Sequence, residues 1–203
     1  MAKASTTKSR RAGESYDGDL RRALLDATIA CHAQTGYDAL SLRAVARAVG
    51  VSHAAPAHHF GSKAGLITTI AIEGFELLLG RLHDVGAKSE KGATLRELGV
   101  AYVGFAASSP AHYEAMFRPE IINHDDERFV AASNAAYAEF AKVVYSFQAA
   151  GWKPDADTIT VSTALWALIH GLCLLRKERS LKRRHPEASE TDLVEIAMSL
   201  VLP

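Results

Sequence analysis

The chain has 203 residues, 48% of them hydrophobic, so it is long enough and apolar enough to bury a core. Its formal net charge is zero, which argues against a nucleic-acid partner until the distribution of charge is considered. Residues 1–66 hold nine Lys and Arg against five Asp and Glu, whereas the remainder holds 14 basic and 18 acidic residues. A basic front on an acidic body is expected when only the front contacts phosphate.

The composition also favours the cytoplasm. The N-terminal segment has no apolar stretch typical of a signal peptide, and no apolar run approaches the roughly 20 residues that span a membrane. Cys31 and Cys173 each lie in an apolar helical pattern, which indicates two reduced core thiols. We therefore expect a cytoplasmic protein with no membrane partner.

The N-terminal third predicts an arm followed by four helices. Residues 1–16 are polar and basic, and we expect a disordered arm there. The next pattern places Leu20, Ala23, Leu24, Ala27 and Cys31 on one face of a helix that ends at Gly36. Three helices are predicted to follow: Ser41 caps one that ends at Gly50, Ser52 caps a very short one that runs into Phe60-Gly61, and Ser62 caps the last.

The remainder is also predicted to be helical. Thr94 and Glu97 form a capping box, and Ser109-Pro110 begins a short helix that Pro119 terminates. Longer helices are expected from 125–126 to Gly151, from about 155 to 177, and from about 189 to 202. Because no alternating strand pattern interrupts them, the fold class is all-α.

The segment SLRAVARAVGVSHAAPAHHF carries the functional signal. Two helices joined by a tight turn need a small residue where they touch and a residue that tolerates positive φ in the turn, and Ala46 and Gly50 satisfy these needs. The second helix should then expose short or polar side chains, so that its N-terminal end enters a major groove about 12 Å wide.

At these residues the chain resembles the TetR family of repressors. The similarity runs through the first helix to Gly36, then S-L-R-A-V-A-R-A-V-G-V-S, then H-H-F-G-S-K-A-G-L. A shorter similarity covers Trp166-Ala-Leu-Ile-His170-Gly171. The resemblance implies an N-terminal helix-turn-helix domain of three helices (17–66) and a C-terminal helical domain (67–203) for dimerisation and effector binding. Pro56 and Ala57 depart from the family, which commonly has Tyr at the second of these positions.

Carried over position by position, the resemblance assigns DNA contacts to the helix-turn-helix. It places base or phosphate contacts at Arg43, Ser52, His53, Ala54, Ala55, His58, His59 and Lys63. The alternative for the charged residues is ordinary solvation. A zinc site at His53 and His58 is disfavoured, because residues five apart face different sides of a helix and no Cys or acidic residue completes the set. We therefore predict neither a metal nor a cofactor.

The C-terminal half offers candidate effector-binding residues, namely Tyr102, Phe105, Tyr113, Met116, Phe117, Trp166 and His170. The expected effector is small and mostly apolar. Aromatic residues at helical spacing also serve as plain core, so a DNA-binding regulator with no effector is the alternative function. A helical enzyme is a distant third, because the chain has no zinc-protease, P-loop, nucleophile-elbow or dinucleotide motif and hence no catalytic residues to name.

The last two helices predict a homodimer. Each carries apolar residues on more than one face: Leu165, Trp166, Ile169, Leu172 and Cys173 in one, and Leu193, Ile196, Ala197, Leu200 and Val201 in the other. A chain of this size cannot cover both faces alone, so we expect a two-fold, four-helix interface that buries about 2,000 Å² or more.

Overall fold

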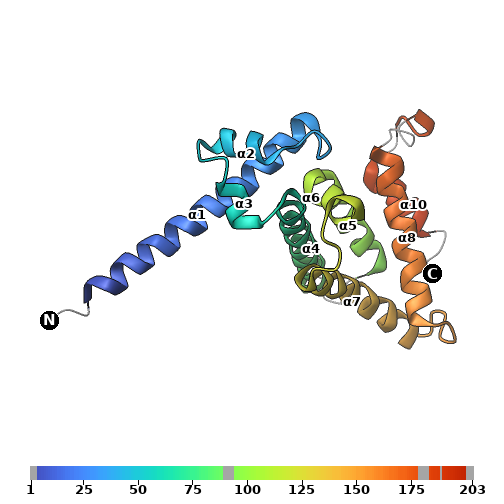
Figure 1. The fold of residues 1–203 in the computed structure, drawn as a ribbon. Coiled ribbons are helices and arrows are strands. Elements are labelled where there is room, and N and C mark those ends of the chain that lie inside the picture. The colour runs from blue at the N-terminus through green and yellow to red at the C-terminus, as the bar shows by residue number, and fades with distance from the viewer. Residues whose placement is uncertain (1–3, 89–93, 178–182, 188, 200–203) are drawn as a thin grey trace.

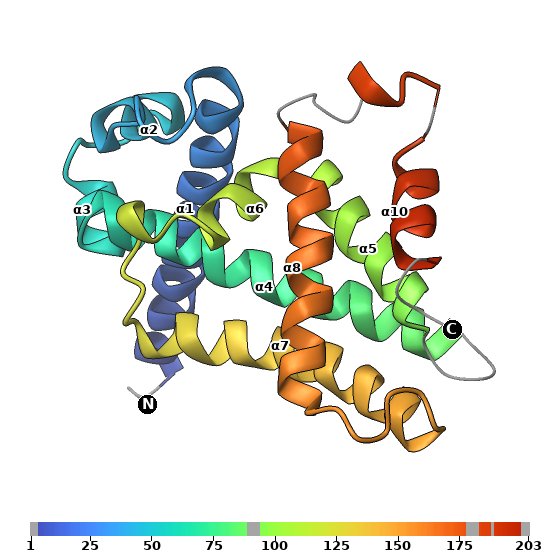
Figure 2. The same ribbon diagram turned by 90° about the vertical axis from the view of Figure 1, so that its right-hand side faces the viewer.

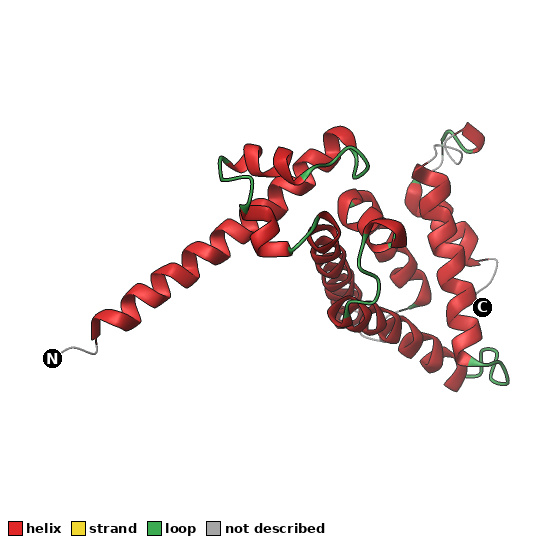
Figure 3. Cartoon of the chain, in the orientation of Figure 1, coloured by secondary structure: helices red, strands yellow, loops and turns green. Residues whose placement is uncertain are grey.

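A computed structural model describes residues 4–88, 94–177, 183–187 and 189–199. Over these residues the chain forms helices and loops only (Figure 3), as the all-α prediction requires. The helices are α1 (Ala4–Thr35), α2 (Leu42–Val49), α3 (Ala55–Phe60), α4 (Lys63–Lys88), α5 (Leu95–Ser108), α6 (Pro110–Met116), the 3-10 turn η1 (Pro119–Ile121), α7 (Glu127–Ala149), α8 (Thr158–Lys177) and α10 (Glu190–Ser199).

The helix α4 links the two halves of the molecule. It packs against α3 on one side and against α5, α6 and α7 on the other. Ile67, Ile70 and Phe75 along it are essentially inaccessible to solvent. Figure 2 shows α8 crossing α4 and α7 on the outer side of the body. A single apolar core therefore runs from the N-terminal helices into the C-terminal body.

The start of α1 differs from the sequence prediction. Residues 4–16 lie in the helix, where a disordered arm was expected, and residues 1–3 lie outside the described part of the chain. Figure 1 shows this N-terminal portion reaching away from the other helices. The physical reason is that an existing helix grows by one hydrogen bond per added residue without a new nucleus, and Ala, Lys, Arg and Glu are good helix formers.

Most predicted helix ends are confirmed. Thr94 and Glu97 form the reciprocal capping box, and Asp126 caps α7 by accepting hydrogen bonds from two backbone N–H groups. Gly36 and Gly151 both have positive φ, where a side chain would be strained. At α6 the prediction is only half right: Ser109 occupies the cap position before Pro110, but its hydroxyl makes no capping hydrogen bond.

The outer helix α8 corrects a second prediction. It has 20 residues and its most apolar window has a mean hydropathy of 1.7, so by length and composition it could cross a membrane. The expectation that no apolar run is that long was wrong. Thr and Ser residues interrupt the apolar run in α8, but the mean hydropathy of the window is still high. Here α8 packs against α5, α7 and α10, yet only 22% of that window is buried within the single chain.

Candidate DNA-binding surface and effector site

The turn between α2 and α3 has the geometry that its residues predict. The Ser41 hydroxyl accepts the Ala44 N–H at 3.2 Å and so caps α2. Gly50 ends α2 with φ of 78°, and Val45 and Ala46 are fully buried. These features fix the angle between α2 and α3. Gly50 bends the backbone in the turn, and the small, buried Ala46 allows the helices to pack closely.

The helix α3 begins later than predicted. Ala54, not Ser52, occupies its cap position, and no side chain caps it. The Ser52 carbonyl accepts the Ala55 N–H at 3.0 Å, which forms a turn ahead of the helix. Pro56 follows within the first helical turn and is buried. Because proline has no N–H, one of the backbone donors that a serine cap would serve is missing from this first turn.

The exposed side of the helix-turn-helix carries most of the predicted DNA contacts. Arg43, Ser52, His53, Ala54 and His58 are exposed, and Ala55 is half-buried. The sequence reasoning passed over Arg47, which is also exposed and lies one turn after Arg43 on α2. The signal was available, since residues four apart share one face of a helix.

Two other predicted contacts are engaged within the protein. The His59 side chain is only 7% exposed, and its Nε2 lies 3.7 Å from Asp17 Oδ1 on α1. Next to it, the Arg21 guanidinium stacks over Phe60 at 5.1 Å. Lys63 Nζ donates to the Asp38 carbonyl at 3.2 Å. His59 therefore joins α3 to α1, and Lys63 joins the start of α4 to the α1–α2 turn.

In the body, five of the seven predicted effector residues come together between α5, α6 and α8. We call Tyr102, Tyr113, Phe117, Trp166 and His170 the aromatic cluster. Its hydrogen bonds form a chain: the Trp166 indole donates to Tyr102 Oη at 3.0 Å, and Tyr113 Oη lies 2.7 Å from His170 Nδ1. The Phe117 and His170 rings meet edge to face at 4.5 Å. Burial lowers the pKa of His170 and raises the pKa of both tyrosines.

Phe105 and Met116 lie elsewhere in the core. Phe105 is fully buried and contacts the Arg81 guanidinium, 5.7 Å from its ring centre. Met116 packs on Gly74 of α4, where an added Cβ would lie 2.7 Å from the Met116 sulfur. Both residues fill space between helices rather than joining the aromatic cluster.

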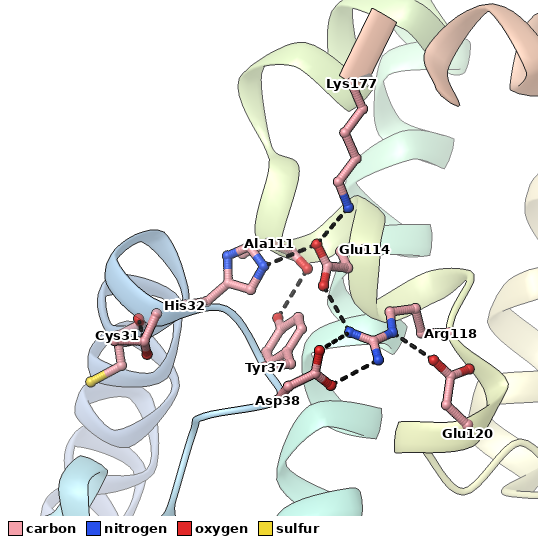
Figure 4. A network of polar contacts seen from close by, with 10 residues as sticks. Cys31, His32, Tyr37, Asp38, Ala111, Glu114, Arg118, Glu120 and Lys177 are labelled. Carbon is pink, nitrogen blue, oxygen red and sulfur yellow. Dashed lines mark hydrogen bonds and ion pairs between the residues drawn. The ribbon is translucent and has the colours of Figure 1, made fainter. Parts of the chain in front are cut away.

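A polar network joins α1 and the α1–α2 turn to α6 and α8 (Figure 4). Glu114 of α6 accepts hydrogen bonds from Lys177 at 2.8 Å and from Arg118 at 3.1 Å, and His32 Nε2 lies 3.4 Å from the same carboxylate. Burial would raise the pKa of Glu114, but the Lys177 and Arg118 hydrogen bonds outweigh it and lower the pKa to about 2. Arg118 also makes two hydrogen bonds to Asp38, at 2.8 and 3.3 Å.

Two further contacts complete this junction. Tyr37, which is fully buried, donates its phenol to the Ala111 carbonyl at 2.9 Å. Arg22 of α1 donates to Glu73 of α4 at 2.6 Å, and His112 Nε2 lies 3.8 Å from the other oxygen of Glu73. The sequence reasoning missed this junction because its partners lie far apart in the chain and charged residues carry no periodic signal.

Among the described residues no group of three His, Cys, Asp or Glu side chains is placed to hold a metal ion. The chemistry that the structure does present is a helix-turn-helix with exposed basic and polar side chains, carried on a helical body with an internal aromatic cluster. That combination defines a DNA-binding regulator of transcription.

Comparison with known proteins gives the same class and adds the family. Residues 24–70 match the model of bacterial regulatory proteins of the tetR family, and residues 95–201 match the Tetracyclin repressor-like C-terminal domain. The chain belongs to the TetR family. It is a DNA-binding transcriptional regulator, and both the family and its curated relatives are regulators rather than enzymes.

Individual relatives are distant but similar along nearly the whole chain. The uncharacterized HTH-type transcriptional regulator Rv0681 of Mycobacterium tuberculosis is 23% identical over 174 residues, which cover 86% of this chain and 78% of that protein. A solved structure of a protein of unknown function from Rhodococcus sp. RHA1 has a TM-score of 0.75 and 28% identity, covering 90% of this chain and 93% of its own. The TetR-family regulator PfmR from Thermus thermophilus has a TM-score of 0.67 and 16% identity, with 88% and 96% covered.

Proposed function

We propose that this chain is a cytoplasmic repressor that binds its operator as a homodimer and is released by a small, mostly apolar effector. The observation that carries the proposal is the position of α6. Within one short helix, Tyr113 contacts His170 of the aromatic cluster and Glu114 contacts His32 of the DNA-binding half. A ligand that displaces Tyr113 would therefore act on the helix that holds α1. A tenfold loss of operator affinity needs only about 1.4 kcal/mol of differential binding.

In this proposal residues 17–66 bind DNA and residues 67–203 bind the effector and the second copy. The tip of α3, with His53, Ala54 and Ala55, reads bases in the major groove. Phosphates are contacted by Arg43, Ser52, His58 and Lys63, and we add Arg47 because it is exposed beside Arg43. We leave out His59, since its side chain is buried against α1.

The proposed dimer forms through the outer faces of α8 and α10. Within one chain α8 leaves Ile159 67% exposed, Leu174 46% and Leu175 42%. Leu165, Ile169 and Cys173, which the sequence reasoning also assigned to the interface, are buried inside the chain's own core. The side chains of Leu193 and Ile196 on α10, and the residues Leu200 and Val201 after its end, lie outside the described part of the chain.

The operator experiment tests the DNA-binding assignments. Fragments of the source genome bound by the protein would be selected, and we expect near-palindromes whose half-sites lie about one helical turn apart. Arg43→Ala and Lys63→Ala should each weaken binding to the selected duplex. Lys63→Ala should do so for every sequence and reduce the slope of log affinity against log salt by about one.

The matched control is Arg96→Ala, an exposed arginine on α5. It should leave both affinity and slope unchanged. Unchanged affinity and slope for Arg43→Ala and Lys63→Ala as well would contradict the two assignments. An operator that no compound in a broad screen can release would favour the alternative, a regulator without an effector.

A further inference from the structure

The hydrogen bonds of the aromatic cluster involve Nδ1 of His170 and leave its Nε2 without a partner among the described residues. An indole N–H can only donate, so Tyr102 Oη is the acceptor for Trp166 and its own hydrogen points elsewhere. Both phenol oxygens approach the same ring nitrogen: Tyr113 Oη lies 2.7 Å from His170 Nδ1 and Tyr102 Oη lies 3.4 Å from it. The 2.7 Å contact fits a Tyr113 hydroxyl that donates to Nδ1, and with this assignment the imidazole proton lies on Nε2.

Burial acts in the same direction. It raises the pKa of Tyr102 and Tyr113, which keeps both phenols protonated and able to donate. It lowers the pKa of His170, which keeps the ring neutral. Among the described residues Nε2 of His170 has no hydrogen-bond partner, and it is not one of the partnerless polar atoms sealed from solvent. The ring therefore presents a free N–H on a half-buried surface.

A second unsatisfied polar atom lies on the same helix stripe. Ser162 is fully buried and its hydroxyl has no hydrogen-bond partner. It precedes Trp166 by one helical turn and His170 by two, and residues four apart share one face of a helix. A buried hydroxyl left unpaired is costly, and serine has an easy remedy in the carbonyl four residues earlier, which is not used here.

The surroundings of this stripe are aromatic. The Phe117 ring lies 4.5 Å from the His170 ring and 6.4 Å from the Trp166 ring. Tyr137 stacks obliquely on Trp166 with ring centres 5.1 Å apart, and its hydroxyl is bonded away from the cluster, to Ile159 and Thr163. A few aligned polar groups on an apolar wall are typical of a small-molecule site.

We propose that the effector is a flat, apolar molecule carrying a hydrogen-bond-accepting oxygen, a carbonyl or a carboxylate, which accepts the Nε2–H of His170, with Ser162 as a second polar contact. The inference rests on the proposed function and narrows it to a ligand class. A cationic ligand is disfavoured, because its charge would meet the hydrogen of an N–H group. A hydrocarbon would leave both His170 and Ser162 unsatisfied.

Binding would be measured by calorimetry on the full-length protein without DNA. The matched probes are 2-acetylnaphthalene, 2-naphthoate and 2-ethylnaphthalene, the last of which has no oxygen. We expect the two oxygen-bearing probes to bind about tenfold more tightly than 2-ethylnaphthalene, the upper range for one hydrogen bond. His170→Phe should abolish this preference, and His170→Gln, which retains an N–H near the Nε2 position, should keep part of it. His124→Phe, the same substitution at an exposed loop residue, should not alter it.

A second measurement, of the His170 tautomer, needs no variant and so does not depend on a substituted protein folding. In ¹⁵N-histidine spectra of the unsubstituted protein, His170 should be the neutral Nε2–H form, and its Nε2 resonance should move with 2-acetylnaphthalene but not with 2-ethylnaphthalene. A protonated Nδ1, equal affinity for all three probes, or no binding of any of them would overturn the ligand class. Because no DNA is present, these results are separate from operator binding, whose failure would instead overturn the proposed function.

Discussion

Replacing Glu114 by Gln should loosen the attachment of the DNA-binding half to the body. The carboxylate is 15% exposed and receives Lys177 at 2.8 Å and Arg118 at 3.1 Å, with His32 at 3.4 Å. A hydrogen bond to a charged group contributes about 1.5–3 kcal/mol when shielded from water, and less when its partner is exposed. Lys177 is 63% exposed, so we expect a total loss of about 2 kcal/mol from these contacts.

Thermal and urea unfolding at pH 7 would measure this loss. For a chain of about 200 residues the expected decrease in melting temperature is about 4–8 °C. Glu120→Gln is the matched control: Glu120 touches the same Arg118 at 2.6 Å but is 58% exposed, so its removal should leave the midpoint nearly unchanged. Equal midpoints for wild type and Glu114→Gln would show that the network in Figure 4 does not hold the junction together.

The stability lost in Glu114→Gln should also depend on pH. Lys177 and Arg118 hold the pKa of Glu114 at about 2 in the folded protein, below the ordinary value of 4.5. A carboxylate with a depressed pKa stabilises the fold above its unfolded pKa and loses that contribution as pH falls from about 4.5 toward 2. The stability difference between wild type and Glu114→Gln should therefore be full at pH 7 and shrink through this acid range. A difference that is the same at pH 3 and pH 7 would contradict the assignment.

Two substitutions and one deletion test other parts of the molecule. Gly65→Ala would place a Cβ 2.1 Å from the Phe60 carbonyl oxygen, so it should displace α3 and reduce operator affinity at least about tenfold in a gel-shift titration. Deleting residues 1–15 should lower operator affinity at low salt without changing sequence preference, and a truncated protein that binds as tightly as the full chain would make this segment dispensable. Leu174→Glu, at a 46% exposed position of α8, should convert the dimer to monomer in sedimentation at micromolar concentration, whereas a monomeric unsubstituted protein would refute the proposed dimer.

The sequence predicted most of the features whose determinants are local. The Ser41 cap, the positive φ of Gly50 and the Thr94–Glu97 box each depend on residues within a few positions of one another, and each is found. Ser52 is the instructive failure. It has the right residue type at the right spacing, but Pro56 changes which backbone groups need a partner, and the helix starts at Ala55 instead.

The candidate site was predictable only in part, for a related reason. Tyr113 and His170 were selected as rare polar groups among apolar ones, and they do meet. Asp38 and Arg118 carried no such signal, because a charged residue is usually solvated and nothing in the sequence says that these two lie together. His59 shows the limit of a family position as a guide, because its side chain is only 7% exposed and its Nε2 lies 3.7 Å from Asp17 on α1.

The two faces of α8 show why apolar patterning cannot assign an interface. Leu165, Ile169 and Cys173 are spaced four apart, form one stripe and are buried in the chain's own core. Ile159 and Leu174 lie off that stripe and remain exposed. Burial of an apolar side chain lowers the free energy by the same amount per unit of area, whether it packs against its own chain or a second copy. Apolar residues therefore occur on both faces of α8, and the sequence alone does not tell the two faces apart. The packing of α5, α7 and α10 on α8 determines which face stays exposed in the single chain.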